Sequence, residues 1–361
     1  MAENRILLLP GDGIGPEITK EALKVLKVIE KITNTSFEIK EALIGGQAID
    51  DKGDPLPIET INELKQTNAV LLAAIGGYKW DNLPNEQKPE KGLLRLRKEL
   101  DAFVNIRPAK VFSALADAST LKREVINGVD ILVLRELTGG IYFGNPRGVS
   151  SINGESACLN TMIYKEEEIK RIVKCACEQA MKRSKKLCSV DKANVLEVSQ
   201  FWRDITIQTV KNDYSEIELT HMYVDNAAMQ LIRNPKQFDV IVTSNLFGDI
   251  LSDESAMLTG SIGLLPSASI GDGSKPGIFE PVHGSAPDIA GQGKANPIAM
   301  ILSLAMLLDN AFAMNKEAKL IQNAVEKVLK QGHRTSDIAE EGVTPISTSQ
   351  MGDKIAETLI L

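Results

Sequence analysis

The chain has 361 residues, which is room for about two domains of ordinary size. Hydrophobic residues make up 43% and charged residues 25%, and this balance excludes a wholly disordered chain, a collagen and a small disulfide scaffold. A net charge of −7 with only 4% aromatic residues disfavours binding to phosphate backbones or anionic lipid. We therefore expect no nucleic-acid partner and no membrane partner.

The four cysteines do not form a disulfide framework. Cys175 and Cys177 would point away from each other on a helix, and Cys158 and Cys188 have no nearby cysteine or histidine in the sequence. The apolar run before Pro10 is shorter than the 7–15 residues, roughly, that a signal peptide needs. We predict reduced thiols in a cytoplasmic protein.

Strands and helices alternate along the chain. Residues 6–9 form a short apolar run that ends in a glycine turn, and Pro16 then suits the first position of a helix. Buried strands are predicted at 70–75, 131–134, 194–198 and 238–243, and helices at 93–100, 299–313, 317–331 and 350–361. This alternation predicts an α/β fold with a largely parallel sheet.

The glycine turn at 11–17 resembles a dinucleotide fingerprint but has the wrong spacing. After Gly11 and Gly13, a third glycine is required at position 16, which is proline. We therefore reject a Rossmann fold and interpret the segment as a tight turn between a strand and a helix. Such turns gather at the carboxyl ends of strands, so this one could still lie near a ligand.

A second loop, residues 279–291, has features of a nucleotide site. Gly284 and Ala286 are small enough for backbone N–H groups to approach a pyrophosphate, and His283 could contact a nucleotide. Asp288 could accept a hydrogen bond from a ribose 2′-OH and would repel a 2′-phosphate. A surface loop ordered by two prolines explains the spacing equally well.

The charged candidates each have an ordinary alternative. Asp249 and Asp253 are four positions apart and share a helical face, where a divalent cation would relieve their repulsion, although a solvated acidic face is the commoner case. Four arginines on separate segments could clamp carboxylates or be unrelated surface residues; they are Arg95, Arg97, Arg107 and Arg135.

Two further side chains could move protons. Lys192 could act as a general base if its pKa were lowered, and Tyr142, in the glycine-rich turn 139–144, could donate a proton. Taken alone, neither pattern outweighs an ordinary surface residue.

Eight segments taken together resemble the β-decarboxylating dehydrogenases of the isopropylmalate/isocitrate dehydrogenase family, in particular its leucine-biosynthesis branch. In chain order they are GDGIGPE, PEKGLLRLRKEL, NIRPAKVF, RELTGGIYFG, VDKANVLEVSQFWR, YVDNAAM, TSNLFGDILSDE and EPVHGSAPDIAG. The resemblance implies two domains that share a large mixed sheet flanked by helices. It places a discontinuous NAD-binding domain at 1–102 plus 262–361, and an inserted domain with substrate, metal and dimer-interface residues at 103–261.

The resemblance also implies an activity and residue roles. The implied reaction is NAD-dependent oxidation of 3-isopropylmalate at C2 and loss of CO₂, which gives 4-methyl-2-oxopentanoate. Lys192 is the implied general base and Tyr142 the implied acid. Substrate contacts are implied for Arg97, Arg107, Arg135, Asp225, Glu90, Leu93 and Leu94, and Mg²⁺ or Mn²⁺ ligation for Asp225, Asp249 and Asp253. A homodimer is implied, with Lys192 and Asp225 supplied across the interface.

The cofactor contacts implied by the resemblance are Glu280, His283, Gly284, Ser285, Ala286, Asp288 and Asn296, with a weaker role for Asp337. Leu93 and Leu94 would bury the isopropyl group, unless they are core residues of an amphipathic helix. The alternatives are a relative acting on isocitrate, homoisocitrate, tartrate or malate, and a non-catalytic regulatory paralogue.

Overall fold

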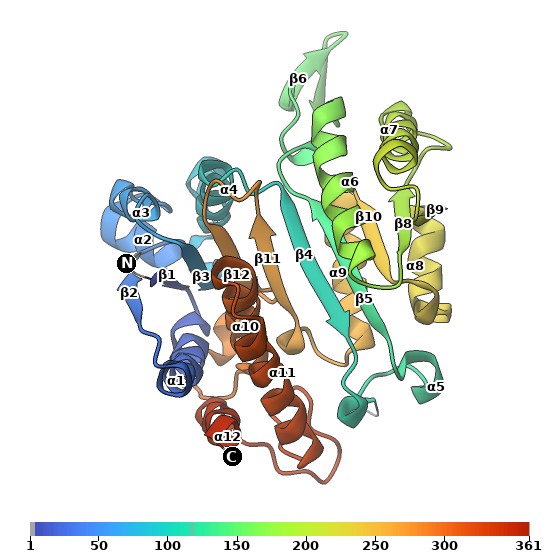
Figure 1. Ribbon diagram of the computed structural model, residues 1–361. Coiled ribbons are helices and arrows are strands. Elements are labelled where there is room, and N and C mark those ends of the chain that lie inside the picture. The colour runs from blue at the N-terminus through green and yellow to red at the C-terminus, as the bar shows by residue number, and fades with distance from the viewer. Residues whose placement is uncertain (1–3, 117, 361) are drawn as a thin grey trace.

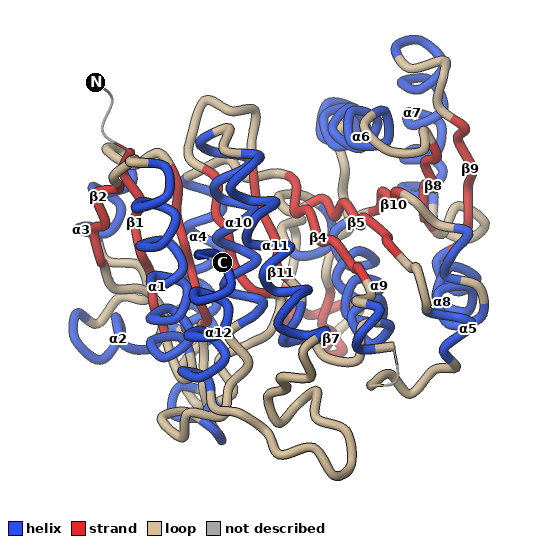
Figure 2. The backbone as a smooth tube through the Cα atoms, turned by 60° about the horizontal axis from the view of Figure 1, so that its bottom comes forward, coloured by secondary structure: helices blue, strands red, loops and turns tan. Residues whose placement is uncertain are grey.

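A computed structural model describes residues 4–116 and 118–360. In this part of the chain, ten strands form one continuous sheet with helices on both sides (Figures 1 and 2). The order across the sheet is β2 (Phe37–Glu41), β1 (Asn4–Gly11), β3 (Ala69–Ala74), β12 (Gly277–Pro281), β11 (Pro266–Ile270), β4 (Val104–Lys110), β5 (Asp130–Glu136), β10 (Val240–Thr243), β8 (Lys186–Asp191) and β9 (Glu218–Tyr223).

The sheet is mixed. Neighbouring strands run parallel from β2 to β12 and again from β5 to β9. The three pairings between these parts, β12 with β11, β11 with β4 and β4 with β5, are antiparallel. This confirms the large mixed sheet that the family resemblance implies. The alternation of strands and helices predicted a largely parallel sheet, and this prediction holds at the two ends of the sheet but not in its middle.

One apolar layer covers a whole face of the sheet, whereas the opposite face is divided. The continuous layer is built by α1 (Gly15–Thr33), α6 (Glu166–Met181), α7 (Glu197–Asp213), α10 (Ile298–Phe312), α11 (Asn315–Lys330) and α12 (Thr348–Ile360). The opposite face has one cluster with α3 (Ile58–Leu64) and α4 (Pro89–Glu99), and another with α5 (Arg123–Ile126), α8 (Val224–Arg233) and α9 (Asn245–Leu258). The gap between these two clusters leaves room for a cleft.

The first strand shows why both faces must be covered. Ile6 and Leu8 enter the continuous layer, while Leu7 and Leu9 enter the cluster on the other face. Side chains of a strand alternate between the two faces, so an unbroken apolar run indicates a strand that is buried on both sides.

Most predicted elements are confirmed, but the strand at 194–198 is wrong. These residues form a turn and the beginning of α7, and the neighbouring strand is β8, which ends at Asp191. The side chain of Val195 is 64% exposed, so the short apolar run does not mark burial here. The last helix is present as α12, and its predicted final residue, Leu361, lies outside the described residues.

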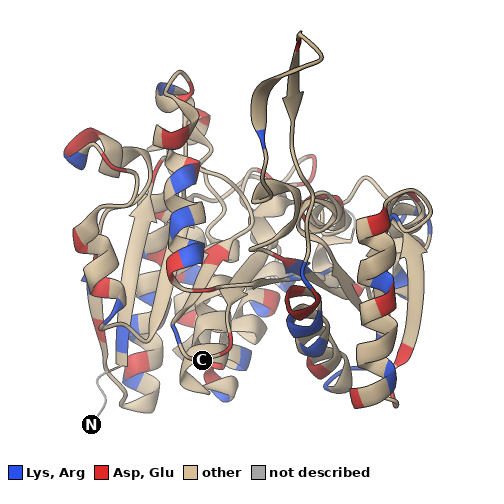
Figure 3. Ribbon diagram, turned by 90° about the horizontal axis from the view of Figure 1, so that it is seen from above, with Lys and Arg blue, Asp and Glu red and all other residues tan. Residues whose placement is uncertain are grey.

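A small hairpin, β6 (Gly148–Ile152) with β7 (Glu155–Leu159), projects away from the main sheet (Figures 1 and 3). Val149 and Ile152 on this hairpin are more than half exposed. In the described residues, no helix combines the length and the apolar character that crossing a bilayer demands.

Candidate active site

A cleft of about 420 Å³ lies over the middle of the sheet, between α4 and α9. It occupies the gap between the two apolar clusters on the divided face. Eleven residues predicted from the sequence line it, and they come from well-separated parts of the chain: Glu90, Leu93, Leu94, Arg97, Arg107, Arg135, Tyr142, Asp249, Glu280, His283 and Gly284.

Arg135 is held in place from α9. It lies near the end of β5, and its Nε and Nη2 donate to Asn245 Oδ1 at 3.1 and 2.9 Å, while Nη1 donates to Asp249. Burial lowers the pKa of the Arg135 guanidinium to about 10, which keeps it positively charged at neutral pH. A Cβ on Gly248 would lie 2.6 Å from Arg135 Cγ, so glycine lets α9 pack this closely against the arginine.

Arg107 connects β4 to the same helix. Its Nη1 donates to Ser252 Oγ at 2.7 Å and to Asp253 Oδ1 at 3.1 Å, and its Nη2 lies 3.9 Å from Asp249 Oδ1. The prediction that Asp249 and Asp253 share one helical face is confirmed, because the same guanidinium reaches both carboxylates. Burial raises the pKa of Asp253, which makes a nearby positive charge important for its ionised form.

Arg97 faces the cleft from α4 and is paired with Glu280. Their Nη2 and Oε1 atoms are 2.8 Å apart, and both side chains are about nine-tenths buried. Glu280, predicted as a cofactor contact, therefore lies on the floor of the cleft. Arg95, the fourth candidate, points elsewhere and binds Asp54 and the Leu56 carbonyl.

Tyr142 belongs to a short 3₁₀ helix, η4 (Gly140–Tyr142), at the edge of the cleft. Its hydroxyl donates to Asp249 Oδ2 at 2.9 Å. Burial, followed by the negative charge of Asp249, raises the pKa of the Tyr142 phenol above its usual value. The phenol therefore keeps its proton and can act as a proton donor.

Lys192 and Asp225 lie together but outside this cleft. Lys192 Nζ is 2.6 Å from Asp225 Oδ1, and this hydrogen bond lowers the pKa of the Asp225 carboxyl. Within residues 4–116 and 118–360, no three His, Cys, Asp or Glu side chains gather as they would around a metal ion. One chain thus brings Asp249 and Asp253 together but does not add Asp225 to them.

A second cavity, of about 330 Å³, continues from the cleft and shares His283 and Gly284 with it. Ala286, Asn296 and Asp337 also line it, and Asn296 Nδ2 donates to Asp337 Oδ2 at 3.0 Å. His283 Nε2 is buried without a hydrogen-bond partner in the described structure, and a Cβ on Gly284 would meet no atom within 4 Å. These features fit a polar ligand that runs along the loop.

The two remaining predicted cofactor residues flank this cavity. Ser285 is buried, and its carbonyl accepts a hydrogen bond from the Ile14 backbone N–H at 2.8 Å. Asp288 is exposed on a 3₁₀ turn, η7 (Pro287–Ile289), where it accepts a hydrogen bond from Tyr78. Burial lowers the pKa of His283, so its ring is neutral at physiological pH.

Sequence reasoning missed three residues that organise the site. Asn245 orients Arg135, Tyr78 contacts Asp288, and buried Asp12 accepts backbone hydrogen bonds from Gly46, Gln47 and Gly76, each at 2.8 Å. Asn245 was detectable in principle, because it lies four positions before Asp249 and therefore on the same face of α9. Asp12 and Tyr78 act across long sequence separations, which no local spacing reveals.

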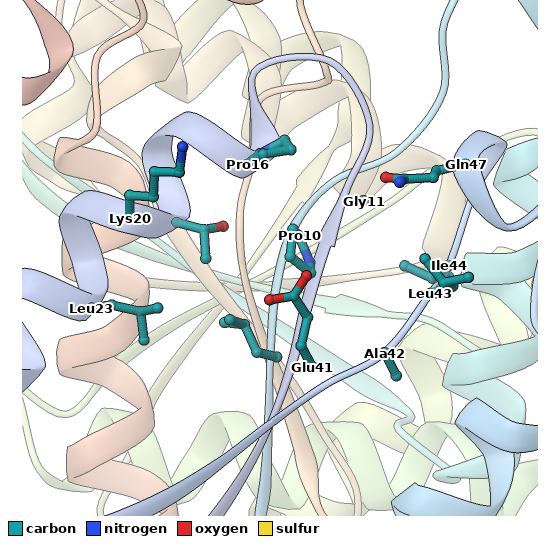
Figure 4. Close-up of a pocket in the computed structure, with 12 residues that line it drawn as sticks. Pro10, Gly11, Pro16, Lys20, Leu23, Glu41, Ala42, Leu43, Ile44 and Gln47 are labelled. Atoms are coloured by element: carbon teal, nitrogen blue, oxygen red, sulfur yellow. The ribbon is translucent and has the colours of Figure 1, made fainter.

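A third cavity, of about 270 Å³, lies beside α1 and is separate from the predicted site residues (Figure 4). Gly11 and Pro16 of the glycine turn line it, together with Lys20 on α1 and Glu41 on β2. The glycine turn also reaches the second cavity through Ile14. The turn therefore borders two cavities, and it contacts the predicted nucleotide loop through the Ile14 backbone and the Glu17 side chain.

Comparisons with known proteins agree with this geometry. A model of the isocitrate/isopropylmalate dehydrogenase family matches residues 5–355. The 3-isopropylmalate dehydrogenase of Aquifex aeolicus is 57% identical over 359 residues, covering 99% of this chain and 98% of that protein. The 3-isopropylmalate dehydrogenase of Nostoc sp. is 60% identical over 361 residues, with 99% of each chain covered.

Solved structures support the same assignment. The isocitrate dehydrogenase of Methylococcus capsulatus superposes with a TM-score of 0.85 at 33% identity, covering 99% of this chain and 100% of that one. A β-decarboxylating dehydrogenase of Thermococcus kodakarensis gives a TM-score of 0.79 at 34% identity, covering 99% and 96%. The chain belongs to the isocitrate/isopropylmalate dehydrogenase family.

Proposed function

We propose that this chain oxidises 3-isopropylmalate at C2 with NAD and then releases CO₂, yielding 4-methyl-2-oxopentanoate for leucine biosynthesis. The observation that supports this proposal most strongly is the cleft, which is lined by three guanidinium groups and two half-buried leucines. In the reaction, C2 loses a hydride to NAD and its hydroxyl loses a proton. The bond from C3 to the carboxylate then breaks, and C3 of the resulting enol takes up a proton.

The arginines would bind the two carboxylates of the malate core. Arg97, Arg107 and Arg135 present positive charge to the cleft, and each of these side chains is about nine-tenths buried. Guanidinium forks match carboxylates in geometry and form charge-assisted hydrogen bonds. Each arginine is already oriented by an acceptor, namely Glu280, Asn105 or Asn245, so substrate would meet positioned donors.

Asp249 and Asp253 suit a hard divalent cation such as Mg²⁺ or Mn²⁺, because carboxylate oxygens are its preferred ligands. We assign Asp225 of a second subunit as the third carboxylate. When bound, the metal would stabilise negative charge on the C2 oxygen. Arg107 and Arg135 now neutralise Asp249 and Asp253, and that role would pass to the metal as the arginines turn to substrate.

A homodimer explains why Lys192 and Asp225 lie apart from the cleft. Apolar side chains between 41% and 59% exposed lie along α8 and α9, and this is unusual for a helix face left in water. They are Met229, Ile232, Ile250 and Met257. We propose that a second copy covers this face and brings Lys192 and Asp225 to the neighbouring cleft.

Two residues would then move the protons. Lys192 would take the proton of the C2 hydroxyl as hydride leaves, and Asp225 beside it would orient the amine. Tyr142 would protonate C3 after CO₂ has left, since its raised pKa keeps the phenol protonated at neutral pH. The two functions are separated in space, which lets one enzyme perform base and acid steps in sequence.

The second cavity is the proposed NAD site. Its contacts would be His283, Gly284, Ser285, Ala286, Asp288 and Asn296, with Glu280 near the reacting end and Asp337 behind Asn296. The unpartnered His283 Nε2 would gain a hydrogen-bond partner from the nucleotide. Asp288 would accept from the ribose 2′-OH, which disfavours the 2′-phosphate of NADP.

Substrate choice would depend on α4. Leu93 and Leu94 are half-buried and line the cleft, so they can bury an isopropyl group, a gain of about 1–3 kcal/mol. Isocitrate would place a third carboxylate against these methyl groups and near the charge of Glu90, which disfavours it. The deciding assay follows NADH formation with Mg²⁺ across 3-isopropylmalate, homoisocitrate, isocitrate, tartrate and malate.

The chain path supports the proposed domain division. Residues 1–102 and 262–361 would form the NAD-binding domain, because β11 and β12 return to pair beside β3. Residues 103–261 would form the inserted domain, joined to the first through the pairing of β4 with β11. We also propose a cytoplasmic location, since all four cysteines are unpaired thiols.

A further inference from the structure

Tyr78 and Asp288 are 210 positions apart in the chain, yet the Tyr78 hydroxyl donates to Asp288 Oδ2 at 3.3 Å. Tyr78 begins a 3₁₀ turn, η1 (Tyr78–Trp80), in the connection between β3 and α4. Asp288 lies on η7, beyond β12. This hydrogen bond therefore joins the loop at one side of the nucleotide cavity to a loop from the neighbouring strand.

The segment that carries Tyr78 is anchored on both sides of it. The backbone N–H of Gly76 donates to buried Asp12 at 2.8 Å. On the other side, the Trp80 ring lies against Gly46, and its Nε1 donates to Asp50 Oδ1 at 3.2 Å. Tyr78 is thus presented from a fixed base, although two-thirds of its surface is exposed.

The loop that carries Asp288 is anchored independently. The Glu17 carboxylate accepts backbone hydrogen bonds from Gly291 and Gly293, each at 3.1 Å, and the Ser285 carbonyl accepts one from Ile14. Within residues 4–116 and 118–360, the hydrogen bond that Asp288 receives from its own loop is donated by Gln292 Nε2 to its backbone carbonyl, and none reaches its side chain from this loop. Tyr78, from the neighbouring loop, donates a hydrogen bond to the Asp288 carboxylate.

We propose that Tyr78 is a positioning residue for NAD, acting through Asp288. The inference rests on the proposed function, in which Asp288 accepts from the adenosine ribose. A carboxylate accepts hydrogen bonds on both oxygens, so with Oδ2 bound by the Tyr78 hydroxyl the ribose 2′-OH would donate to Oδ1. NADP requires this carboxylate to turn away from its 2′-phosphate, and the bond to Tyr78 opposes that rotation. Tyr78 therefore contributes both to NAD affinity and to discrimination against NADP.

The test measures equilibrium dissociation constants for NAD and NADP by titration calorimetry, without the second substrate. The proteins are the unaltered enzyme, Tyr78→Phe, Asp288→Ala and the double variant. Tyr78→Phe loses one exposed hydrogen bond that acts only through Asp288, so NAD binding should weaken by roughly two- to tenfold, the range of an ordinary hydrogen bond, with a smaller preference over NADP. In the Asp288→Ala background, which lacks the acceptor, Tyr78→Phe should have no further effect, because the two residues act as one unit.

Steady-state kinetics provide the second readout. Tyr78→Phe should raise KM for NAD and leave both kcat at saturating NAD and KM for the hydroxy acid unchanged. Lys79→Met is the matched control, since it removes the ion pair with Asp50 on the same turn without touching Asp288. It should bind NAD like the unaltered enzyme.

The outcomes separate the two levels of the hypothesis. Unchanged NAD affinity in Asp288→Ala would overturn the cofactor role of Asp288, and with it the role of Tyr78. Weaker binding in Asp288→Ala, combined with either no effect of Tyr78→Phe or fully additive effects in the double variant, would overturn the role of Tyr78 alone. A loss seen in Tyr78→Ala but absent in Tyr78→Phe would assign the contribution to the ring and also refute the proposal.

Discussion

A single side-chain oxygen of Asn245 accepts two hydrogen bonds from the guanidinium of Arg135, at 3.1 and 2.9 Å. The amide of the same side chain donates to the Gly139 carbonyl, and its backbone N–H donates to the buried hydroxyl of Tyr164. Asn245 is consequently fixed on three sides. Because Asn245 is fixed, it also fixes the position of the Arg135 guanidinium. A residue that binds a substrate carboxylate in a defined orientation needs to be held in this way.

We expect Asn245→Ala to lower kcat/KM for 3-isopropylmalate by about tenfold or more, because the buried Arg135 guanidinium loses the acceptor of two of its hydrogen bonds. Thermal unfolding of the variant distinguishes misplacement of Arg135 from loss of the fold. Asn310→Ala, an exposed change on α10, is the control and should retain full activity. Unaltered kcat/KM in a well-folded Asn245→Ala enzyme would mean that Arg135 needs no support from Asn245.

Removal of the divalent cation should abolish turnover. A strong chelator leaves Asp249 and Asp253 without the charge that the proposed chemistry needs, and added Mg²⁺ or Mn²⁺ should restore activity. Asp249→Asn removes one charged ligand and should weaken metal-dependent turnover strongly. The measurement is NADH formation against free metal concentration, and full activity in chelator would exclude the metal role.

Tyr142→Phe should slow enol protonation or decarboxylation more than hydride transfer, since only the hydroxyl is lost. Single-turnover kinetics that monitor NADH and released CO₂ separately make this distinction. The raised pKa of Tyr142 means that the phenol stays protonated throughout the neutral range. We therefore expect ionisation of Tyr142 to cause no loss of rate in the neutral range, and a fall in rate near neutral pH that disappears in Tyr142→Phe would contradict the assignment.

The shared site predicts complementation between inactive chains. Lys192→Ala lacks the proposed base, and Arg107→Ala lacks a carboxylate ligand, so each homodimer should be nearly inactive. A mixed dimer can assemble one intact site from the remaining Lys192 of one chain and Arg107 of the other. Recovery of activity on mixing is the expected result; its absence, after mass spectrometry has shown subunit exchange, would place both residues in the same site.

Leu94→Ser should lower kcat/KM for 3-isopropylmalate by more than it lowers kcat/KM for malate. The change removes apolar surface that only the substituted substrate can bury. The measurement is the ratio of kcat/KM for 3-isopropylmalate to kcat/KM for malate, in the unaltered enzyme and in the variant. An equal effect on both substrates would show that the isopropyl group is bound elsewhere.

Local spacing predicted contacts well wherever a regular element carries the residues. Asp249 and Asp253 are one helical turn apart, and a single guanidinium reaches both. The spacing failed at 194–198, where Val195 is apolar yet exposed on a turn. A run of so few residues has no period by which to distinguish a strand from the start of a helix.

Local spacing could not predict that residues from distant parts of the chain meet in one site. Arg97, Arg107 and Arg135 lie on three separate elements, and each alone has the pattern of an ordinary arginine. The order of motifs along the chain identified them as a group, because the family resemblance already contains the fold. The contact of Tyr78 with Asp288 was not predictable in this way, since it depends on how two distant loops meet.

The short turn at residues 11–17 has a consequence for exchanging parts between enzymes. Through Asp12 it holds the loop that leads to Tyr78, and through Ile14 and Glu17 it holds the loop that carries Asp288. A graft of the Asp288 loop alone, taken from an NADP-dependent relative, would arrive without the partners that set its shape. Redesign of cofactor preference should therefore transplant three pieces together, namely residues 11–17, 76–80 and 283–293, as one cassette.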